Sequence, residues 1–198
     1  MKKLTSLVFV TTTLSLITLT GHAEERDVRL QLGAGVGVTF VDELCDSTAD
    51  DPIDCDDTAT NYQALAGIRA GDYFGVEGGY VNLGEAESGN DLLKGTAEVD
   101  GQKLQAVGYL PFNQHVSLFA KGGMFFWDLE GDAVTGGTSI ADFSESGEDP
   151  VVSAGIEGAL SDNVRLQLAW DRYFNVGNED RTGESDVDTV GVNAMLLF

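Results

Sequence analysis

Apolar residues occupy every second position over much of this chain. The clearest run puts seven of them on one side of an extended segment, with polar residues or glycine between them: Val28, Leu30, Leu32, Ala34, Val36, Val38 and Phe40. Side chains of a β-strand alternate between two faces, so this run predicts a strand with one apolar face. Residues 189–198 repeat the pattern and end on Phe198. A terminal strand of this kind suits a sheet that closes on itself, because closure leaves no unpaired edge, and it also suits an ordinary soluble sandwich.

The same period of two predicts eight strands, at residues 28–40, 62–70, 74–80, 96–110, 116–126, 152–160, 164–171 and 189–198. Their connections alternate in length. Three are short turns, at residues 71–72, 111–114 and 161–163, and four are long acidic loops, at residues 41–59, 84–95, 128–150 and 175–188. All the long loops then lie at one end, an asymmetry that a soluble sheet does not need and a membrane barrel has. We predict an all-β, eight-stranded antiparallel up-and-down transmembrane barrel with short periplasmic turns and long acidic extracellular loops.

Aromatic residues gather near both ends of the predicted strands. Those assigned to the short-turn end are Phe74, Tyr109, Phe112 and Phe198, and those assigned to the loop end are Phe40, Tyr62, Tyr80, Phe126 and Trp170. Aromatic girdles are typical of membrane proteins because amphipathic rings settle at the two lipid–water interfaces. The aromatic pattern therefore agrees with a transmembrane barrel.

The first 23 residues have the features of a secretory signal. Lys2 and Lys3 precede an apolar, threonine-rich run, and the small residues Gly21 and Ala23 predict cleavage after Ala23. We expect residues 1–23 to be a signal peptide for Sec-dependent export and residues 24–198 to be the outer membrane β-barrel domain. No later stretch approaches the ~18 unbroken apolar residues that a membrane helix needs.

The exported chain would be strongly acidic. Removal of Lys2 and Lys3 leaves nine of the 11 Lys and Arg residues against 33 Asp and Glu residues, so the formal charge moves from −22 to −24. Such a charge argues against nucleic acid as a partner. Cys45 and Cys55 lie in one acidic loop. In an oxidising compartment they predict a disulfide that closes this loop, with two free thiols as the alternative.

Several charged residues fall on the inner side of the predicted strands. The basic ones are Arg29, Arg69, Lys121 and Arg165, and the acidic ones are Glu77, Glu157 and Asp171. An eight-stranded barrel is just wide enough for its own side chains to fill it. Charges buried there persist when they are paired. We therefore predict a polar plug built on a charge network, with a narrow ion pathway as the alternative.

Two segments carry a family resemblance. Residues 107–111 read Val-Gly-Tyr-Leu-Pro, and residues 118–127 read Leu-Phe-Ala-Lys-Gly-Gly-Met-Phe-Phe-Trp. With the strand pattern, they resemble the OmpA-like eight-stranded transmembrane barrels of the bacterial outer membrane, over about the whole mature chain. The resemblance implies an internal salt-bridge network at Glu77, Lys121, Glu157 and Arg165. It also implies that Phe198 is the C-terminal aromatic signal read by the outer-membrane barrel assembly machinery.

One departure from the resemblance limits what it implies. Full-length OmpA proteins carry a periplasmic peptidoglycan-binding domain after the barrel, and nothing follows Phe198 in this sequence. We therefore expect a barrel domain alone, without a role in tethering the cell wall.

No segment predicts a catalytic, cofactor-binding or metal site. Residues 33–37 have the glycine spacing of a nucleotide-binding loop, but the strand pattern runs through them and no helix follows. His115 and Ser117 share a face, as in outer-membrane lipid A deacylases, but they adjoin a short periplasmic turn and lack that family's following Asn-Ala. The acid cluster at residues 50–57 offers oxygen ligands for Ca²⁺ without the spacing of an EF-hand, which favours a solvated loop that collects cations weakly.

These patterns predict a non-enzymatic outer membrane protein with a structural and surface-interaction role, in envelope integrity, lipopolysaccharide or cation contact, or adhesion through acidic loops. The expected partners are outer membrane lipid and lipopolysaccharide, the barrel assembly machinery, and divalent cations between loop carboxylates and lipopolysaccharide phosphates. A small ion-conducting, porin-like channel is the alternative. A lipid A-modifying enzyme is a more distant one.

Overall fold

The computed structural model describes residues 28–41, 54–55, 58–90, 93–135, 138–178 and 183–198. Within these ranges the chain forms nine strands. They are β1 (Val28–Val41), β2 (Asp54–Cys55), β3 (Thr58–Ala70), β4 (Phe74–Asn90), β5 (Leu93–Pro111), β6 (Val116–Thr135), β7 (Thr138–Ala159), β8 (Val164–Asn178) and β9 (Gly183–Leu197). No helix in the described part of the chain is long and apolar enough to cross a membrane.

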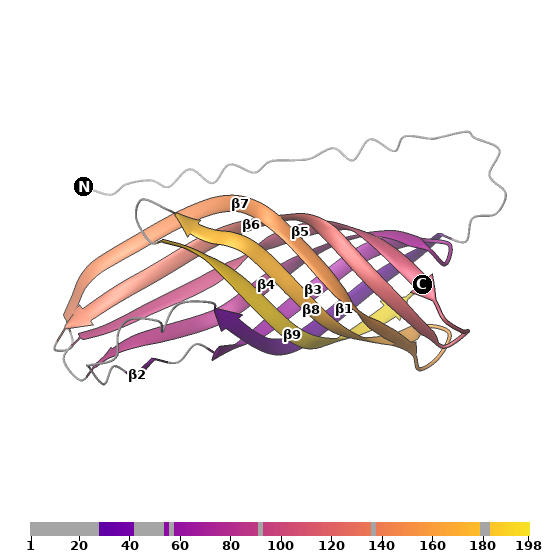
Figure 1. Ribbon diagram of the computed structural model, residues 1–198, viewed down its shortest axis with the longest axis horizontal. Helices are drawn as coiled ribbons and strands as arrows, with labels where there is room; N and C mark the ends of the chain where they lie inside the picture. Colours follow the sequence, from indigo (N-terminus) through magenta and orange to yellow (C-terminus); the bar gives the residue numbers. More distant parts are fainter. Residues whose placement is uncertain (1–27, 42–53, 56–57, 91–92, 136–137, 179–182) are drawn as a thin grey trace, which may run out of the picture.

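Eight of these strands form a closed antiparallel barrel, as predicted (Figure 1). Each long strand pairs with its neighbours in the chain, and β1 also pairs with β9, from Gln31 opposite Leu197 to Val41 opposite Val187. The last residue completes the seam, because the backbone N–H groups of Leu30 and Phe198 each donate to the other's carbonyl oxygen. The two-residue strand β2 lies outside this ring and pairs with β4.

The alternation of the sequence places the apolar residues on the outer wall. Every second residue of β1 from Val28 to Phe40 is exposed, and so is every second residue of β9 from Val190 to Leu196. The intervening residues point into the barrel and are buried or half-buried there. In water this arrangement would be inside out, but lipid demands an apolar exterior and the barrel interior accepts polar groups.

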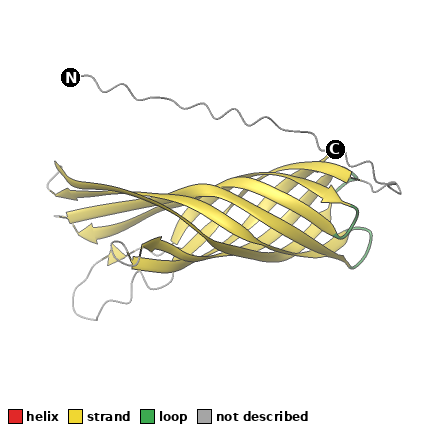
Figure 2. Cartoon of the chain, turned by 90° about the horizontal axis from the view of Figure 1, so that it is seen from above, coloured by secondary structure: helices red, strands yellow, loops and turns green. Residues whose placement is uncertain are grey.

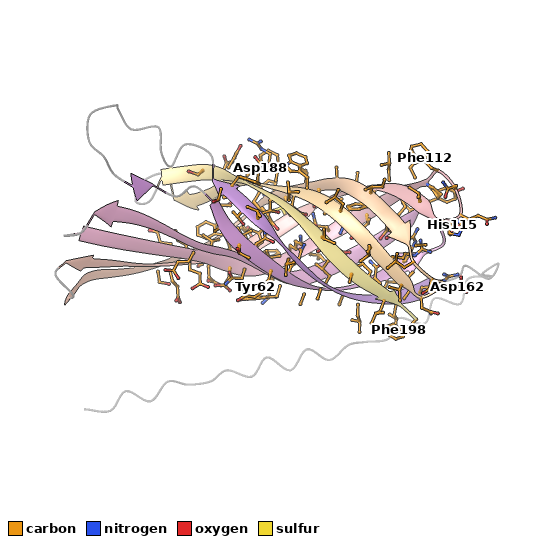
Figure 3. All side chains as sticks on the ribbon, turned by 90° about the horizontal axis from the view of Figure 1, so that it is seen from below. Tyr62, Phe112, His115, Asp162, Asp188 and Phe198 are labelled. Carbon is orange, nitrogen blue, oxygen red and sulfur yellow. The ribbon has the colours of Figure 1, made fainter. Side chains whose placement is uncertain are left out.

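The three short turns lie together at one end of the barrel, near the C-terminus. Figure 3 shows Phe112, His115, Asp162 and Phe198 at this end, while Tyr62 and Asp188 lie toward the other. The exposed aromatics follow the same division. Phe74, Phe112 and Phe198 are exposed at the short-turn end, where Tyr73 joins them. Phe40, Tyr62, Tyr80, Phe126 and Trp170 are exposed toward the opposite end.

Tyr109 departs from this division, and its assignment to the outer girdle was wrong. It is buried inside the barrel, with only 4% of its surface exposed. Because Leu110 and Gly108 occupy the outward positions of β5, Tyr109 has the inward parity, which the aromatic count overlooked.

The prediction of four long loops was also wrong in part, because much of this sequence is strand. β6 and β7 continue as one hairpin to residues 135 and 138, through most of the loop expected at residues 128–150. The β4–β5 and β8–β9 hairpins extend in the same way. Figure 2 shows these strands projecting past the barrel. Outside the membrane neither face of a hairpin must be apolar, so the alternation that marks a strand in lipid disappears.

Candidate functional site in the barrel lumen

The predicted inward charges do converge inside the barrel. Six of the seven form ion pairs there: Arg69, Glu77, Lys121, Glu157, Arg165 and Asp171. They come from five strands, β3, β4, β6, β7 and β8, which alternation alone placed on the inner face. The seventh, Arg29, is half-buried on β1 directly opposite Arg69, and it too is engaged by a neighbouring group.

The first centre of the network is the pair formed by Lys121 on β6 and Glu77 on β4. The Lys121 Nζ lies 2.5 Å from Glu77 Oε1, and both side chains are almost fully buried. Gln31 donates to the other oxygen of Glu77 at 3.4 Å, and Lys121 also donates to Gln167 at 3.4 Å. The lysine and the carboxylate are therefore held by neutral neighbours as well as by each other, which is what buried charges require.

The second centre is Glu157 on β7. Its Oε1 atom accepts from Arg69 at 2.7 Å and from Arg165 at 3.2 Å, and its Oε2 atom accepts from Gln167 at 3.0 Å. Gln167 thus bridges the two centres, since its own side-chain oxygen accepts from Lys121. The guanidinium of Arg69 also lies over the ring of Tyr109, 3.9 Å from the centroid, a cation–π contact that explains the inward position of this tyrosine.

The third centre is Asp171 on β8, and its partner was missed. Lys103 of β5 lies 3.4 Å from Asp171 Oδ1 and is as deeply buried as the aspartate. Ser153 and Thr189 donate to the same carboxylate. Lys103 follows the inward parity of Gln105 and Val107 on its strand. Parity could therefore have found it, had the strand been read beyond its apolar half.

An apolar cluster closes the lumen on the loop side of this network, and the sequence reading did not anticipate it. Its buried members are Val81, Leu83, Phe125, Trp127, Leu129, Val151, Tyr173, Val176 and Val187. Phe125 and Tyr173 meet edge to face, with ring centroids 4.7 Å apart. The sequence does contain a signal for this cluster. Phe125, Trp127 and Leu129 lie at even spacings from Lys121 on β6, so they share its inward face.

Outside the barrel wall, charges cluster at the loop end of β8 and β9. Arg172 lies 2.7 Å from Asp186 and 3.1 Å from Asp188. The hydrogen bond from Arg172, followed by one from the backbone of Asn175, holds the pKa of Asp186 below its usual range. Asp188 also accepts from the indole of Trp170 at 2.9 Å. These carboxylates are therefore engaged by the protein itself.

The remaining predicted features lie partly outside the described residues. Cys45 and the signal region 1–23 are among those not described, and the side chain of Cys55 is not described, so the disulfide and the signal peptide stay predictions. His115 is exposed in a short turn, and Ser117 is buried at the same end. Within the described ranges, no three His, Cys, Asp or Glu side chains are grouped so as to hold a metal ion.

A closed eight-stranded barrel with an apolar outer wall, a charged interior and short turns gathered at one end defines an outer membrane β-barrel protein. A family model described as the OmpA-like transmembrane domain matches residues 25–198. The chain belongs to this family and is a protein of the bacterial outer membrane.

Relatives and solved structures agree with this assignment. Outer membrane protein A of Shigella flexneri is 29% identical over 122 residues, which are 61% of this chain and 34% of that protein. The corresponding protein of Salmonella typhi is 28% identical over 135 residues, which are 66% of this chain and 38% of that protein. The chain thus spans little more than a third of the length of these relatives.

Among solved structures, Ail, the attachment invasion locus protein of Yersinia pestis, matches 86% of this chain and 98% of its own, with a TM-score of 0.56 and 16% identity. Neisserial surface protein A matches 86% of this chain and 97% of its own, with a TM-score of 0.58 and 13% identity. At these identities the likeness is one of fold.

Proposed function

We propose that this protein is a non-enzymatic barrel that holds lipopolysaccharide against its outer wall through divalent cations, while its lumen serves as a sealed structural plug. The observation that carries the proposal is a ladder of carboxylates on the outer wall. It consists of Glu98, Asp100, Asp128, Glu130 and Glu148, from the loop-end halves of β5, β6 and β7.

The carboxylate ladder contains like charges placed directly opposite each other. Glu98 faces Glu130 across the β5–β6 pairing, and Asp100 faces Asp128. Directly opposed like charges destabilise a sheet. Neutral donors relieve part of this repulsion, since Asn82 donates to Glu98 at 2.6 Å and Tyr80 donates to Asp100 at 2.8 Å. A divalent cation between the opposed carboxylates would remove the rest, because Ca²⁺ and Mg²⁺ take oxygen ligands.

The position of the ladder supports lipopolysaccharide as the partner. Phe126, Asp128 and Glu130 occupy successive outward positions on β6, so the acids begin where the aromatic girdle ends. A pocket of about 460 Å³ opens on this boundary, with Tyr80 and Phe126 beside Asp100, Asp128 and Glu148. The aromatic rings lie on the membrane side of this pocket and the carboxylates on the loop side. This order suits a lipid whose acyl chains contact the rings and whose phosphorylated head group lies near the carboxylates. In this proposal the lipid phosphates supply further oxygen ligands to the cation.

The contents of the lumen support a plug rather than the alternative of a channel. Its three ion-pair centres are buried, and the apolar cluster around Phe125 and Tyr173 fills the loop side. Ions would have to separate these pairs and also cross a dehydrated segment. Nothing among the described residues assembles the nucleophile, base and oxyanion donors that the enzymatic alternative requires.

The test compares stability in two kinds of vesicle. The refolded protein is placed in vesicles with or without lipopolysaccharide, and the midpoint of thermal unfolding is followed by its heat-modifiable gel band during Mg²⁺ titration. We expect Mg²⁺ to raise the midpoint only with lipopolysaccharide, and a chelator to reverse the rise. The triple variant Asp100→Asn, Asp128→Asn, Glu130→Gln should lose the response.

The matched control is Asp72→Asn with Asp162→Asn, which removes acids at the short turns and should keep the Mg²⁺ response. An equal response in the triple variant would refute the proposal. A response of wild-type protein that does not depend on lipopolysaccharide would refute it as well.

A further inference from the structure

The short-turn end of the lumen contains a pocket that the plug does not account for. The pocket has a volume of about 440 Å³ and is lined by Arg69, Asp72, Pro111, Asn113, Gln114, Ser117 and Arg165. These residues come from all three short turns or from the strand ends beside them. The pocket is therefore made only by the closed barrel, at the end that faces the periplasm in outer membrane barrels.

Buried positive charge is in excess beside this pocket. Arg69 and Arg165 both donate to the same oxygen of Glu157, so two guanidiniums share one buried carboxylate. The Arg69 and Arg165 side chains are only 5% and 16% exposed. The remaining acid of the pocket, Asp72, is exposed to solvent, and it offers Arg69 only its backbone carbonyl oxygen, at 3.4 Å.

Arg165 also has hydrogen-bonding capacity left over. Its Nε atom is shielded from solvent and has no acceptor in the part of the chain that the structure describes. A buried donor without an acceptor costs free energy. The Nε edge of a guanidinium is one of the faces that bind carboxylate or phosphate in a bidentate manner. Asn113, Gln114 and Ser117 line the same pocket with neutral polar groups.

We propose that this pocket is a binding site for a small oxyanion, a carboxylate or phosphate group, presented from the periplasmic side and held by Arg165 and Arg69. An anion there balances the second guanidinium, and Arg165 turns its shielded Nε–H toward the pocket to donate to it. This contrasts with the chain as a whole, whose formal charge of −22 repels anions. The site is independent of the lipopolysaccharide contact, which lies at the opposite end of the barrel.

The test is calorimetric titration of the refolded, full-length protein in an uncharged detergent, with sodium phosphate and sodium acetate as separate probes and sodium chloride holding ionic strength constant. We expect saturable binding of at least one oxyanion. Tighter binding of phosphate would identify a phosphate ligand, and tighter binding of acetate a carboxylate ligand. Arg165→Gln should weaken binding about tenfold or more, as for loss of a charge-assisted hydrogen bond. Asp72→Asn should strengthen it, because a competing negative charge is removed.

The matched control is Arg172→Gln, since Arg172 is likewise an arginine paired with carboxylates but lies at the loop end. This variant should bind like wild type. A second measurement needs no variant: the NMR signal of the Arg165 Nε–H in the wild-type protein should shift on addition of the oxyanion. The proposal is overturned if neither oxyanion binds saturably, if Arg165→Gln and Arg172→Gln behave alike, or if the Nε–H signal does not move.

Discussion

At the scale of single residues, Glu157 is the carboxylate that joins three side chains of the lumen. Its carboxylate accepts hydrogen bonds from two arginines and a glutamine, and the residue is only 1% exposed. Removing its charge leaves Arg69 and Arg165 facing each other without a counterion. Arg69 keeps its contact with Tyr109 but loses its only buried carboxylate contact among the described residues.

We therefore expect Glu157→Gln to destabilise the barrel by roughly 3–5 kcal/mol, the usual cost of breaking a buried ion pair. The measurement is urea unfolding in lipid vesicles, followed by tryptophan fluorescence. Asp162→Asn, in an exposed turn, is the control and should stay within about 0.5 kcal/mol of wild type. If both variants unfold at the same urea concentration, the lumen is hydrated enough to screen its charges.

Period-two alternation placed the lumen charges on the correct face but could not choose their partners. Arg69 and Glu157 lie on strands β3 and β7, which do not pair with each other. Which side chains meet across the lumen depends on the tilt and stagger of the strands. Neither quantity can be derived from the alternation within a single strand. Lys103 was missed and Tyr109 misplaced for a simpler reason: local composition was given more weight than parity.

At the scale of strands, β6 shows how closely the backbones approach. Its neighbouring glycines face opposite ways. A Cβ atom on Gly122 would meet nothing within 4 Å, while one on Gly123 would collide with the backbone carbonyl of Leu104 on β5. Of these two positions, only position 123 requires a glycine.

We expect Gly123→Ala to destabilise the protein by roughly 1–3 kcal/mol, because β5 must shift to admit the methyl group. Gly122→Ala should be close to neutral, since its methyl group would point into lipid. Parallel urea titrations of the two refolded variants provide the measurement. Equal midpoints for this adjacent pair would contradict the described facing of β6.

The membrane-spanning part of each strand could be predicted because lipid imposes a pattern on it. The extension of β6 and β7 past Asp128 could not, because the exposed positions there carry polar residues such as Ser144, Ser146 and Glu148 and show no apolar alternation. Backbone hydrogen bonds between β7 and β6 hold this part of the hairpin together. Such bonds do not depend on side-chain type, so the sequence does not reveal them.

At the scale of the whole molecule, two different barriers lie in series along the barrel. The ion-pair network holds the middle and the short-turn end, and the apolar cluster holds the loop end. Breaking one of them leaves the other in place.

We therefore expect no discrete openings from the refolded wild type in planar-bilayer recordings, and none from Lys121→Ala, whose apolar cluster is intact. Adding Phe125→Ala and Tyr173→Ala to Lys121→Ala removes the large rings as well and should produce openings. Openings in wild type that change in Lys121→Ala would instead support a channel gated by the ion pairs.

The hydrogen bonds between Leu30 and Phe198 set an order in time. They join the first barrel strand to the end of the last one, so all eight barrel strands must be present before the ring can close. Neighbouring hairpins close small loops at low entropic cost, whereas this seam closes the longest loop of all. Until it forms, two strand edges remain without partners, and lipid offers them none. The seam thus acts as a check on completeness, since only a chain carried through to its last strand satisfies the edge of its first.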